Sequence, residues 1–184
     1  MVVNSRMWPN PDACVVLFTG ASSTGKTTVA RQVHRRSPLP TMLLLGDDLR
    51  LARPSAGADW LKTLDATDLR AFQLGCDRAY YDALGAFPRH GLCVIGEVGL
   101  RDRARKELCE AFLASVPHLL VRLVCEREAR NERERSRHDV PVGLSDETAR
   151  NETTDLAFDL VIDTGRVTPE QAAAEVCAKL PLPH

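Results

Sequence analysis

Residues 20–27 constrain the fold of this 184-residue chain more than any other feature. They read Gly-Ala-Ser-Ser-Thr-Gly-Lys-Thr, which satisfies every fixed position of the pattern G-x-x-x-x-G-K-[ST]. The apolar, β-rich run 14–19 precedes them, and a helix-prone stretch from about Lys26 to Arg36 follows. A glycine-rich loop between a buried strand and a helix is typical of a phosphate-binding loop, so an α/β fold is expected.

The spacing within this loop suits the binding of a nucleoside triphosphate. Gly20 and Gly25 allow successive N–H groups to face one concavity, and the following helix directs its N-terminal dipole to the same point. Lys26 would reach the β- and γ-phosphates, and the hydroxyl of Thr27 would bind Mg²⁺. We therefore expect ATP and Mg²⁺ here. The expected nucleotide-binding residues are Gly20, Ala21, Ser22, Ser23, Thr24, Gly25, Lys26, Thr27 and Thr28.

Short apolar runs alternate with longer amphipathic stretches along the chain. This pattern predicts a doubly wound, mostly parallel, five-stranded sheet flanked by helices. The expected strands are 14–19, 41–45, 92–95, 119–125 and 158–162. The expected helices are 26–36, 67–87, 101–115, 126–137 and one that begins at Thr168-Pro169-Glu170. We expect a single domain over 1–184, with an irregular N-terminal segment at 1–12.

Charge and cysteine content argue against other classes of protein. Lys and Arg total 24 against 25 Asp and Glu, so the overall charge favours neither nucleic acid nor an anionic membrane as a partner. No run approaches the ~20 apolar residues of a spanning helix, and the N-terminus lacks a signal-peptide pattern. The six cysteines, none in a C-x-x-C pair, are expected to be buried, reduced thiols of a cytoplasmic protein. The oligomeric state stays open.

Acidic residues follow the second and third predicted strands. Asp47 and Asp48 follow the run 41–45, and Glu97 follows 92–95. Ligands of open α/β sheets bind beyond the carboxyl ends of the strands, so these carboxylates should face the phosphate loop. A kinase needs one carboxylate for the acceptor hydroxyl and usually another for Mg²⁺. Glu97 is the metal candidate, with an ordinary turn residue as the alternative, whereas Asp47 suits a helix N-cap or the surface.

Five arginines lie between residues 126 and 137, interleaved with glutamates. One interpretation is a solvated helix with ion pairs four residues apart. The other is a mobile lid that closes over the nucleotide and brings arginine to the transferring phosphate. Arg133 and Arg137 lie one helical turn apart on one face and are the candidates for that role. The remaining arginines, including Arg127 and Arg130, are expected at the surface.

Aromatic residues between the second and third predicted strands are candidates for an acceptor pocket. Trp60, Tyr80 and Tyr81 could stack on a ring of a small hydroxylated substrate. The alternative for Tyr80 is ordinary core packing of an amphipathic helix.

Taken together, these residues resemble the chloramphenicol phosphotransferase family of small P-loop kinases, over most of the chain from about Cys14 to Leu180. The matching segments are the loop 20–27, Gly46-Asp47-Asp48, Val98, Cys125-Glu126, Arg133-Glu134, Arg137-His138-Asp139 and 158–164. Gly46-Asp47-Asp48 looks like the family's Gly-x-Asp. In the family the third strand tends to end in two adjacent acids, whereas here Gly96 precedes Glu97.

The resemblance implies that Asp48 is the catalytic aspartate, acting with Lys26, Arg133 and Arg137. It implies transfer of the ATP γ-phosphate to a hydroxyl of a small molecule, chloramphenicol in the founding case, and hence a role in antibiotic resistance. Two alternatives stay open. One is a metabolic kinase for a nucleoside, sugar or shikimate-like acceptor. The other is a nucleotide-gated binding protein, which would lose ATP slowly and without an acceptor.

Overall fold

The computed structural model describes residues 10, 12–46, 60–137, 141–152 and 154–180. Five strands and six helices occur in these residues. The strands are β1 (Val15–Thr19), β2 (Thr41–Leu44), β3 (Cys93–Glu97), β4 (His118–Val124) and β5 (Leu160–Asp163). The helices are α1 (Lys26–Arg36), α4 (Ala66–Arg89), α5 (Arg103–Leu113), α6 (Arg127–Arg135), α7 (Leu144–Asn151) and α8 (Pro169–Cys177).

The strands form one parallel sheet in the order β2-β3-β1-β4-β5. The central strand β1 pairs on both sides, with Val16 opposite Ile95 of β3 and opposite Leu119 of β4. Every residue of β1 is buried, as expected for a parallel strand covered on both faces. The carboxyl ends of all five strands therefore share one edge of the sheet. The predicted α/β fold with a five-stranded sheet flanked by helices is confirmed.

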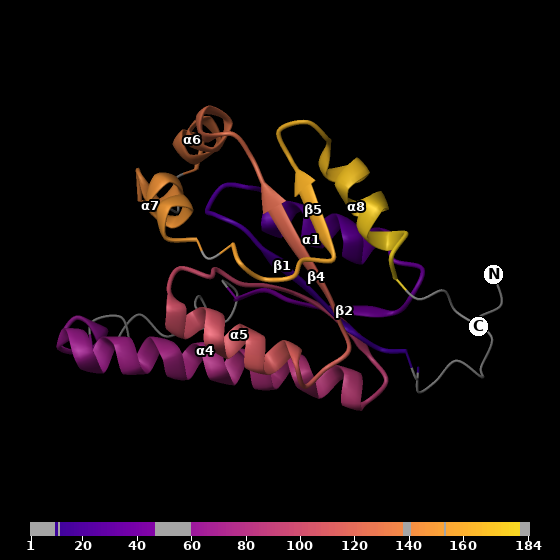
Figure 1. The fold of residues 1–184 in the computed structure, drawn as a ribbon, viewed down its shortest axis with the longest axis horizontal. Coiled ribbons are helices and arrows are strands. Elements are labelled where there is room, and N and C mark those ends of the chain that lie inside the picture. Colours follow the sequence, from indigo (N-terminus) through magenta and orange to yellow (C-terminus); the bar gives the residue numbers. More distant parts are fainter. Residues whose placement is uncertain (1–9, 11, 47–59, 138–140, 153, 181–184) are drawn as a thin grey trace.

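Alternate residues of β1 contribute to two separate cores, because successive side chains of a strand point to opposite faces. Phe18 packs in the core that includes Val29 of α1 and Ala173 of α8. Leu17 packs in the core that includes Tyr81 of α4 and Phe112 of α5. Figure 1 shows the same division, with α4 and α5 on one face of the sheet and α1 and α8 on the other.

Most of the predicted elements are present with small shifts at their ends. The bounds of α1 agree with the prediction, and α8 begins after a capping box between Thr168 and Gln171. The last strand begins at Leu160 instead of 158. Its start is delayed because the Asp159 carboxylate accepts the backbone N–H of Leu120 at 2.7 Å, while Phe158 packs into the second core.

The helix α7 is absent from the elements that the sequence predicts. Glu134 of α6, only 4% exposed, accepts backbone N–H groups from Gly143 at 2.8 Å and Ser145 at 2.6 Å. A side chain from the preceding helix thus supplies the cap that the sequence around 144–151 does not indicate. In Figure 1, α6 and α7 lie beyond the tip of β4.

The predicted burial of the cysteines holds for four of the six thiols. All six cysteines are free, and Cys14, Cys93, Cys109 and Cys125 are buried. Cys76 is an exception, because it lies on an exposed face of α4. Within the described ranges, no helix is long and apolar enough to cross a membrane.

Candidate active site

The loop between β1 and α1 has the backbone geometry that its glycines allow. The φ angle is 141° at Gly20, 63° at Ser23 and 92° at Gly25. A Cβ atom at Gly20 would lie 2.4 Å from the carbonyl oxygen of Leu123, so no other residue fits there. Gly25 is the N-cap of α1 and has no side chain with which to cap the first amides of the helix. Those amides are consequently free of a side-chain cap, as an anion site at a helix N-terminus requires.

One buried hydroxyl in the loop is unsatisfied. Among the described residues, Ser23 Oγ is buried and has no hydrogen-bond partner, while its backbone has the left-handed conformation that is uncommon outside glycine. Buried polar atoms are almost always paired in folded proteins. Ser23 therefore fits a loop that binds a polar ligand.

Lys26 lies along the same loop. Its Nζ donates to the carbonyl oxygens of Gly20 at 2.8 Å and Ala21 at 2.9 Å. These bonds hold the ammonium group against the first residues of the loop. The positive charge is therefore next to the turn that precedes the amides of α1.

Thr27 and Glu97 meet across the start of α1. The hydroxyl of Thr27 donates to the Glu97 carboxylate, with distances of 3.1 and 3.0 Å to its two oxygens. Glu97 ends β3 and is 7% exposed. The structure thus brings together the two residues that the sequence suggests as metal ligands.

Tyr80 of α4 fixes the strand end from which Glu97 projects. Its hydroxyl donates to the carbonyl oxygen of Leu44 at 2.6 Å and accepts the backbone N–H of Glu97 at 3.0 Å. A Cβ atom at Gly96 would lie 2.8 Å from the Tyr80 hydroxyl and 2.9 Å from Leu84 Cδ2. Packing against Tyr80 and Leu84 therefore favours glycine at position 96.

The donor set fits a magnesium ion that binds together with a nucleotide. Mg²⁺ prefers oxygen ligands and is usually held by one or two carboxylates plus phosphates and water. Thr27 and Glu97 supply a hydroxyl and a carboxylate. In the part of the chain that the structure describes, no cluster of three or more His, Cys, Asp or Glu could hold a metal by itself.

Arg133 also reaches the loop. Its guanidinium donates to the carbonyl oxygen of Ser23 at 3.5 Å, to Thr164 Oγ1 at 3.0 Å and to the Thr164 carbonyl at 2.7 Å. Thr164 Oγ1 in turn donates to the carbonyl oxygen of Thr24 at 2.8 Å. Arg133 thus links α6, the loop and the carboxyl end of β5. Arg137 lies after the last residue of α6 and is exposed.

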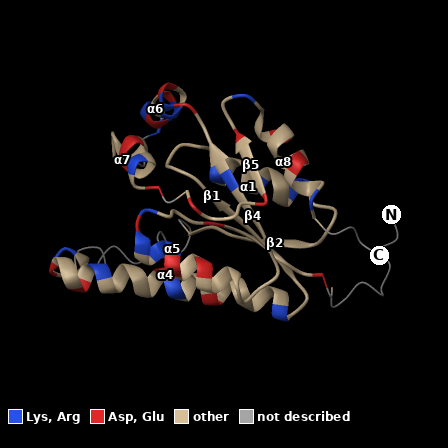
Figure 2. Cartoon of the chain, in the orientation of Figure 1, with Lys and Arg blue, Asp and Glu red and all other residues tan. Residues whose placement is uncertain are grey.

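The other arginines of this segment differ from one another. Arg127 is exposed and pairs with Asp146 of α7, with 2.5 Å between the nearest atoms. The expected surface position is wrong for Arg130, whose side chain is 13% exposed and donates to the Cys125 carbonyl at 2.6 Å. Figure 2 shows acidic and basic residues mixed along α6. Closure of the segment 126–137 as a lid stays a prediction.

The candidate acceptor residues lie in different environments. Trp60 is 52% exposed, and its ring meets Phe72 edge-on at 5.7 Å between centroids. Tyr80 and Tyr81 are buried in the second core, where the ring centroid of Tyr81 lies 4.9 Å from that of Phe112. The predicted base Asp48 lies outside the described residues, as does Asp47.

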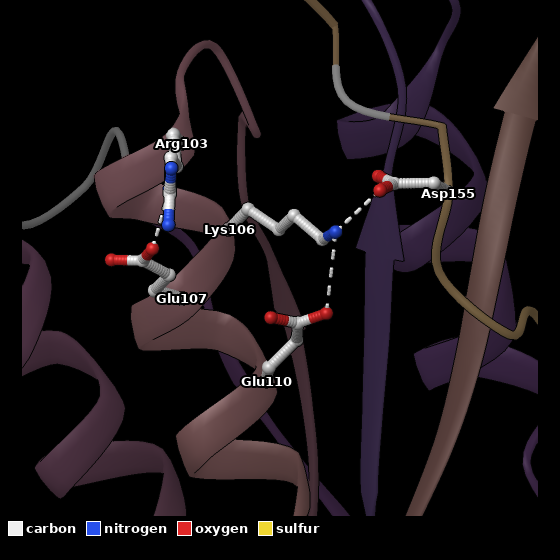
Figure 3. A pocket seen from close by; sticks show the side chains of 5 residues that line it. All are labelled: Arg103, Lys106, Glu107, Glu110 and Asp155. Carbon is white, nitrogen blue, oxygen red and sulfur yellow. Dashed lines mark hydrogen bonds and ion pairs between the residues drawn. The ribbon is translucent and has the colours of Figure 1, made fainter.

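A hollow of about 460 Å³ lies on the α5 face, lined by Arg103, Lys106, Glu107, Glu110 and Asp155. Figure 3 shows Lys106 extending from α5 toward Asp155, which lies in the segment after α7. The Lys106 ammonium is 2.5 Å from Asp155 and 3.5 Å from Glu110. None of the five lining residues belongs to the phosphate loop, so this hollow is separate from the candidate site.

Sequence reasoning missed two residues that contact the loop. Thr164 follows the carboxyl end of β5, and the strand-end argument that selects Glu97 could have selected it too. Thr148 lies in α7, and its Oγ1 accepts the backbone N–H of Ser22 at 2.8 Å. No sequence signal points to Thr148, because the sequence does not predict the helix that positions it.

A family model described as chloramphenicol phosphotransferase-like protein matches residues 13–181. This range includes the phosphate loop, Glu97, Arg133 and Thr164. Among curated proteins, no sequence matches the chain.

Several solved structures share the fold, two of them described as kinases. An unliganded sugar kinase from Janibacter sp. HTCC2649 is 21% identical over 90% of this chain and 93% of that chain, with a TM-score of 0.66. The APS kinase of Mycobacterium tuberculosis, solved with AMPPNP and APS, is 19% identical over 91% and 97%, with a TM-score of 0.67. A tunicamycin resistance protein of Deinococcus radiodurans is 22% identical over 92% and 96%, with a TM-score of 0.61. At these identities the likeness establishes the fold alone.

Proposed function

The chain belongs to the chloramphenicol phosphotransferase-like family, and we propose that it transfers the γ-phosphate of ATP to a hydroxyl group of a small molecule. The main support is the pairing of Thr27 with Glu97 at the start of α1, one residue after Lys26. A cation, a hydroxyl and a buried carboxylate thus gather beside amides that no side chain caps. That combination suits a metal-bound polyphosphate.

Each group has a distinct task in this proposal. The amides at the start of α1 bind phosphate oxygens, and Lys26 neutralises charge on the transferring group. Thr27 and Glu97 would hold Mg²⁺, which supplies charge neutralisation and orientation of the phosphates when it is bound. Catalysis of phosphoryl transfer depends mainly on positioning and electrostatics. Charged and polar groups that the fold holds in place therefore suit this reaction.

Asp48 is assigned the role of orienting or deprotonating the acceptor hydroxyl. The assignment rests on the Gly46-Asp47-Asp48 resemblance and on its place after β2, the strand next to β3. Arg133 and Arg137 are assigned to the developing phosphate charge, because the guanidinium fork matches phosphate oxygens. Among the three aromatic candidates for contact with the acceptor, Trp60 is exposed, whereas Tyr80 and Tyr81 are buried, so Trp60 is assigned this contact.

A hydroxylated antibiotic is the acceptor that the family suggests, and self-protection against it is the corresponding physiological role. The test is incubation of the protein with ATP, Mg²⁺ and a panel of hydroxylated antibiotics, sugars, nucleosides and shikimate-like acids. Mass spectrometry should detect one added phosphoryl group on one class, because only the true acceptor turns over fast. A sugar or acid product would select the metabolic alternative. ATP loss without any product would favour the nucleotide-gated binding protein.

A further inference from the structure

The phosphate loop is anchored by a helix that the proposed chemistry does not use. The backbone N–H of Ser22 donates to Thr148 Oγ1 of α7 at 2.8 Å, across 126 residues of sequence. Thr148 is 6% exposed, and its hydroxyl donates within α7, with the carbonyl oxygen of Leu144 at 2.7 Å and that of Ser145 at 3.2 Å. A hydroxyl has one proton and two lone pairs, so this back-bond leaves its oxygen as an acceptor facing Ser22.

The position of α7 is itself fixed by α6. The buried carboxylate of Glu134 accepts the N–H groups of Gly143 and Ser145, which begin the helix. The neighbouring residue Arg133 donates to the Ser23 carbonyl and to Thr164. Two consecutive residues of α6 therefore hold α7 and the loop, and Thr148 joins those two elements directly.

We propose that Thr148 is a positioning residue of the phosphate loop: it holds the Ser22 amide so that the following amides are ordered before nucleotide binds. The loop needs such an anchor, because Ser23 has a positive φ that an unconstrained chain seldom adopts. Ordering the loop in advance removes an entropy cost that the nucleotide would otherwise meet on binding. The consequence for catalysis rests on the proposed function, whereas the anchoring itself does not.

The test compares Thr148→Val, which keeps the shape and removes the acceptor, with Thr148→Ser, which keeps the hydroxyl. Thr154→Val is the matched control, since Thr154 is exposed. Amide exchange of Ser22 is measured by NMR without nucleotide, and the dissociation constant of Mg·ADP by titration. In Thr148→Val the Ser22 amide should exchange faster and ADP should bind roughly three- to tenfold more weakly. Thr148→Ser and Thr154→Val should stay near wild type in both measurements.

Several outcomes would overturn the inference. These are equal or tighter ADP binding by Thr148→Val, an unchanged Ser22 exchange rate, or a Thr148→Ser variant as weak as Thr148→Val. If Thr148→Val does not fold, Thr148→Ser and Thr148→Ala supply the same comparison. A wild-type protein that fails to bind Mg·ADP would instead refute the proposed function, and the exchange rates would still decide whether Thr148 anchors the loop.

Discussion

The side-chain hydroxyl of Thr27 lies 3.1 and 3.0 Å from the two carboxylate oxygens of Glu97. The contact joins the first turn of α1 to the carboxyl end of β3, through two residues that are 70 positions apart in the sequence. Tyr80 accepts the backbone N–H of Glu97, and burial together with the Thr27 hydroxyl restrains the carboxylate itself. The two oxygen donors are therefore arranged before any ligand arrives.

Replacement of Glu97 by Gln should raise the Mg²⁺ concentration that phosphotransfer requires. The amide keeps the size of the side chain and removes the charge, so we expect roughly 10- to 100-fold more Mg²⁺ for half-maximal phosphotransfer. Activity is measured over a titration of Mg²⁺ at saturating ATP. Glu128→Gln, on the exposed surface of α6, is the control. An unchanged Mg²⁺ requirement in Glu97→Gln would exclude Glu97 as a ligand.

Alanine substitutions at the arginines of α6, and at Arg137 after it, should differ in their effect on kcat. Arg133→Ala is expected to lower kcat by roughly 10²-fold or more if its guanidinium serves the transferring phosphate, and Arg137→Ala likewise. Arg127→Ala should lower kcat far less, since Arg127 is exposed and pairs with Asp146 of α7 instead of contacting the loop. Steady-state kinetics of the three variants makes the comparison. Small and equal effects from all three would leave only a structural role for the segment.

Replacement by alanine should change the stability of the fold in opposite directions at two glycines. In Gly96→Ala the new methyl group would collide with Tyr80 and Leu84. The collision should lower the free energy of unfolding by about 1–3 kcal/mol. A methyl group at Gly75 of α4 would have no contact within 4 Å among the described residues, so Gly75→Ala should stabilise the fold by about 0.5–1 kcal/mol. Urea unfolding measures both. Tolerance of alanine at 96 would contradict the packing reason given for that glycine.

The stability contribution of Asp102 should depend on pH. Asp102 caps α5 and accepts bonds from Arg70 and Arg105, which hold the pKa of its carboxyl well below the usual value. A carboxyl with a lowered folded-state pKa stabilises the fold above its unfolded pKa of about 3.9, and this contribution is lost as pH falls through the folded value. Asparagine at position 102 can still cap α5. Asp102→Asn should therefore lower the free energy of unfolding by only about 1 kcal/mol at pH 7.

That difference between wild type and Asp102→Asn should narrow as the pH falls below about 4. The measurement is urea unfolding of both proteins at pH 7, 5 and 3. A difference that stays constant across this range would show that the charge of Asp102 does not contribute.

The sequence predicts the phosphate loop and its flanks well because local chemistry determines them. The pattern 20–27 demands a strand before it and a helix after it, and Pro38 follows closely on the end of α1. Glu97 can be selected from sequence because strand ends of a parallel sheet share one edge.

What the sequence does not predict depends on tertiary contacts. Glu134 of α6 caps the start of α7, and no periodic apolar pattern in residues 144–151 indicates that helix. The hydrogen bond between Ser22 and Thr148 needs this helix in place, so no sequence pattern indicates it either. The charged neighbours of Arg130 favour a surface position, yet its guanidinium bonds the Cys125 carbonyl.

Lys26→Ala is the most direct test of phosphoryl transfer at this loop. Lys26 is the one cation whose place is fixed by the loop pattern, and its contact matters most in the transition state. The measurement is transfer of label from γ-labelled ATP to the acceptor found in the mass-spectrometric panel, with the melting temperature as a check on folding. Wild type should transfer the label, and Lys26→Ala should lose activity by roughly 10³-fold or more with its melting temperature nearly unchanged. Activity of the folded variant within about tenfold of wild type would contradict the account.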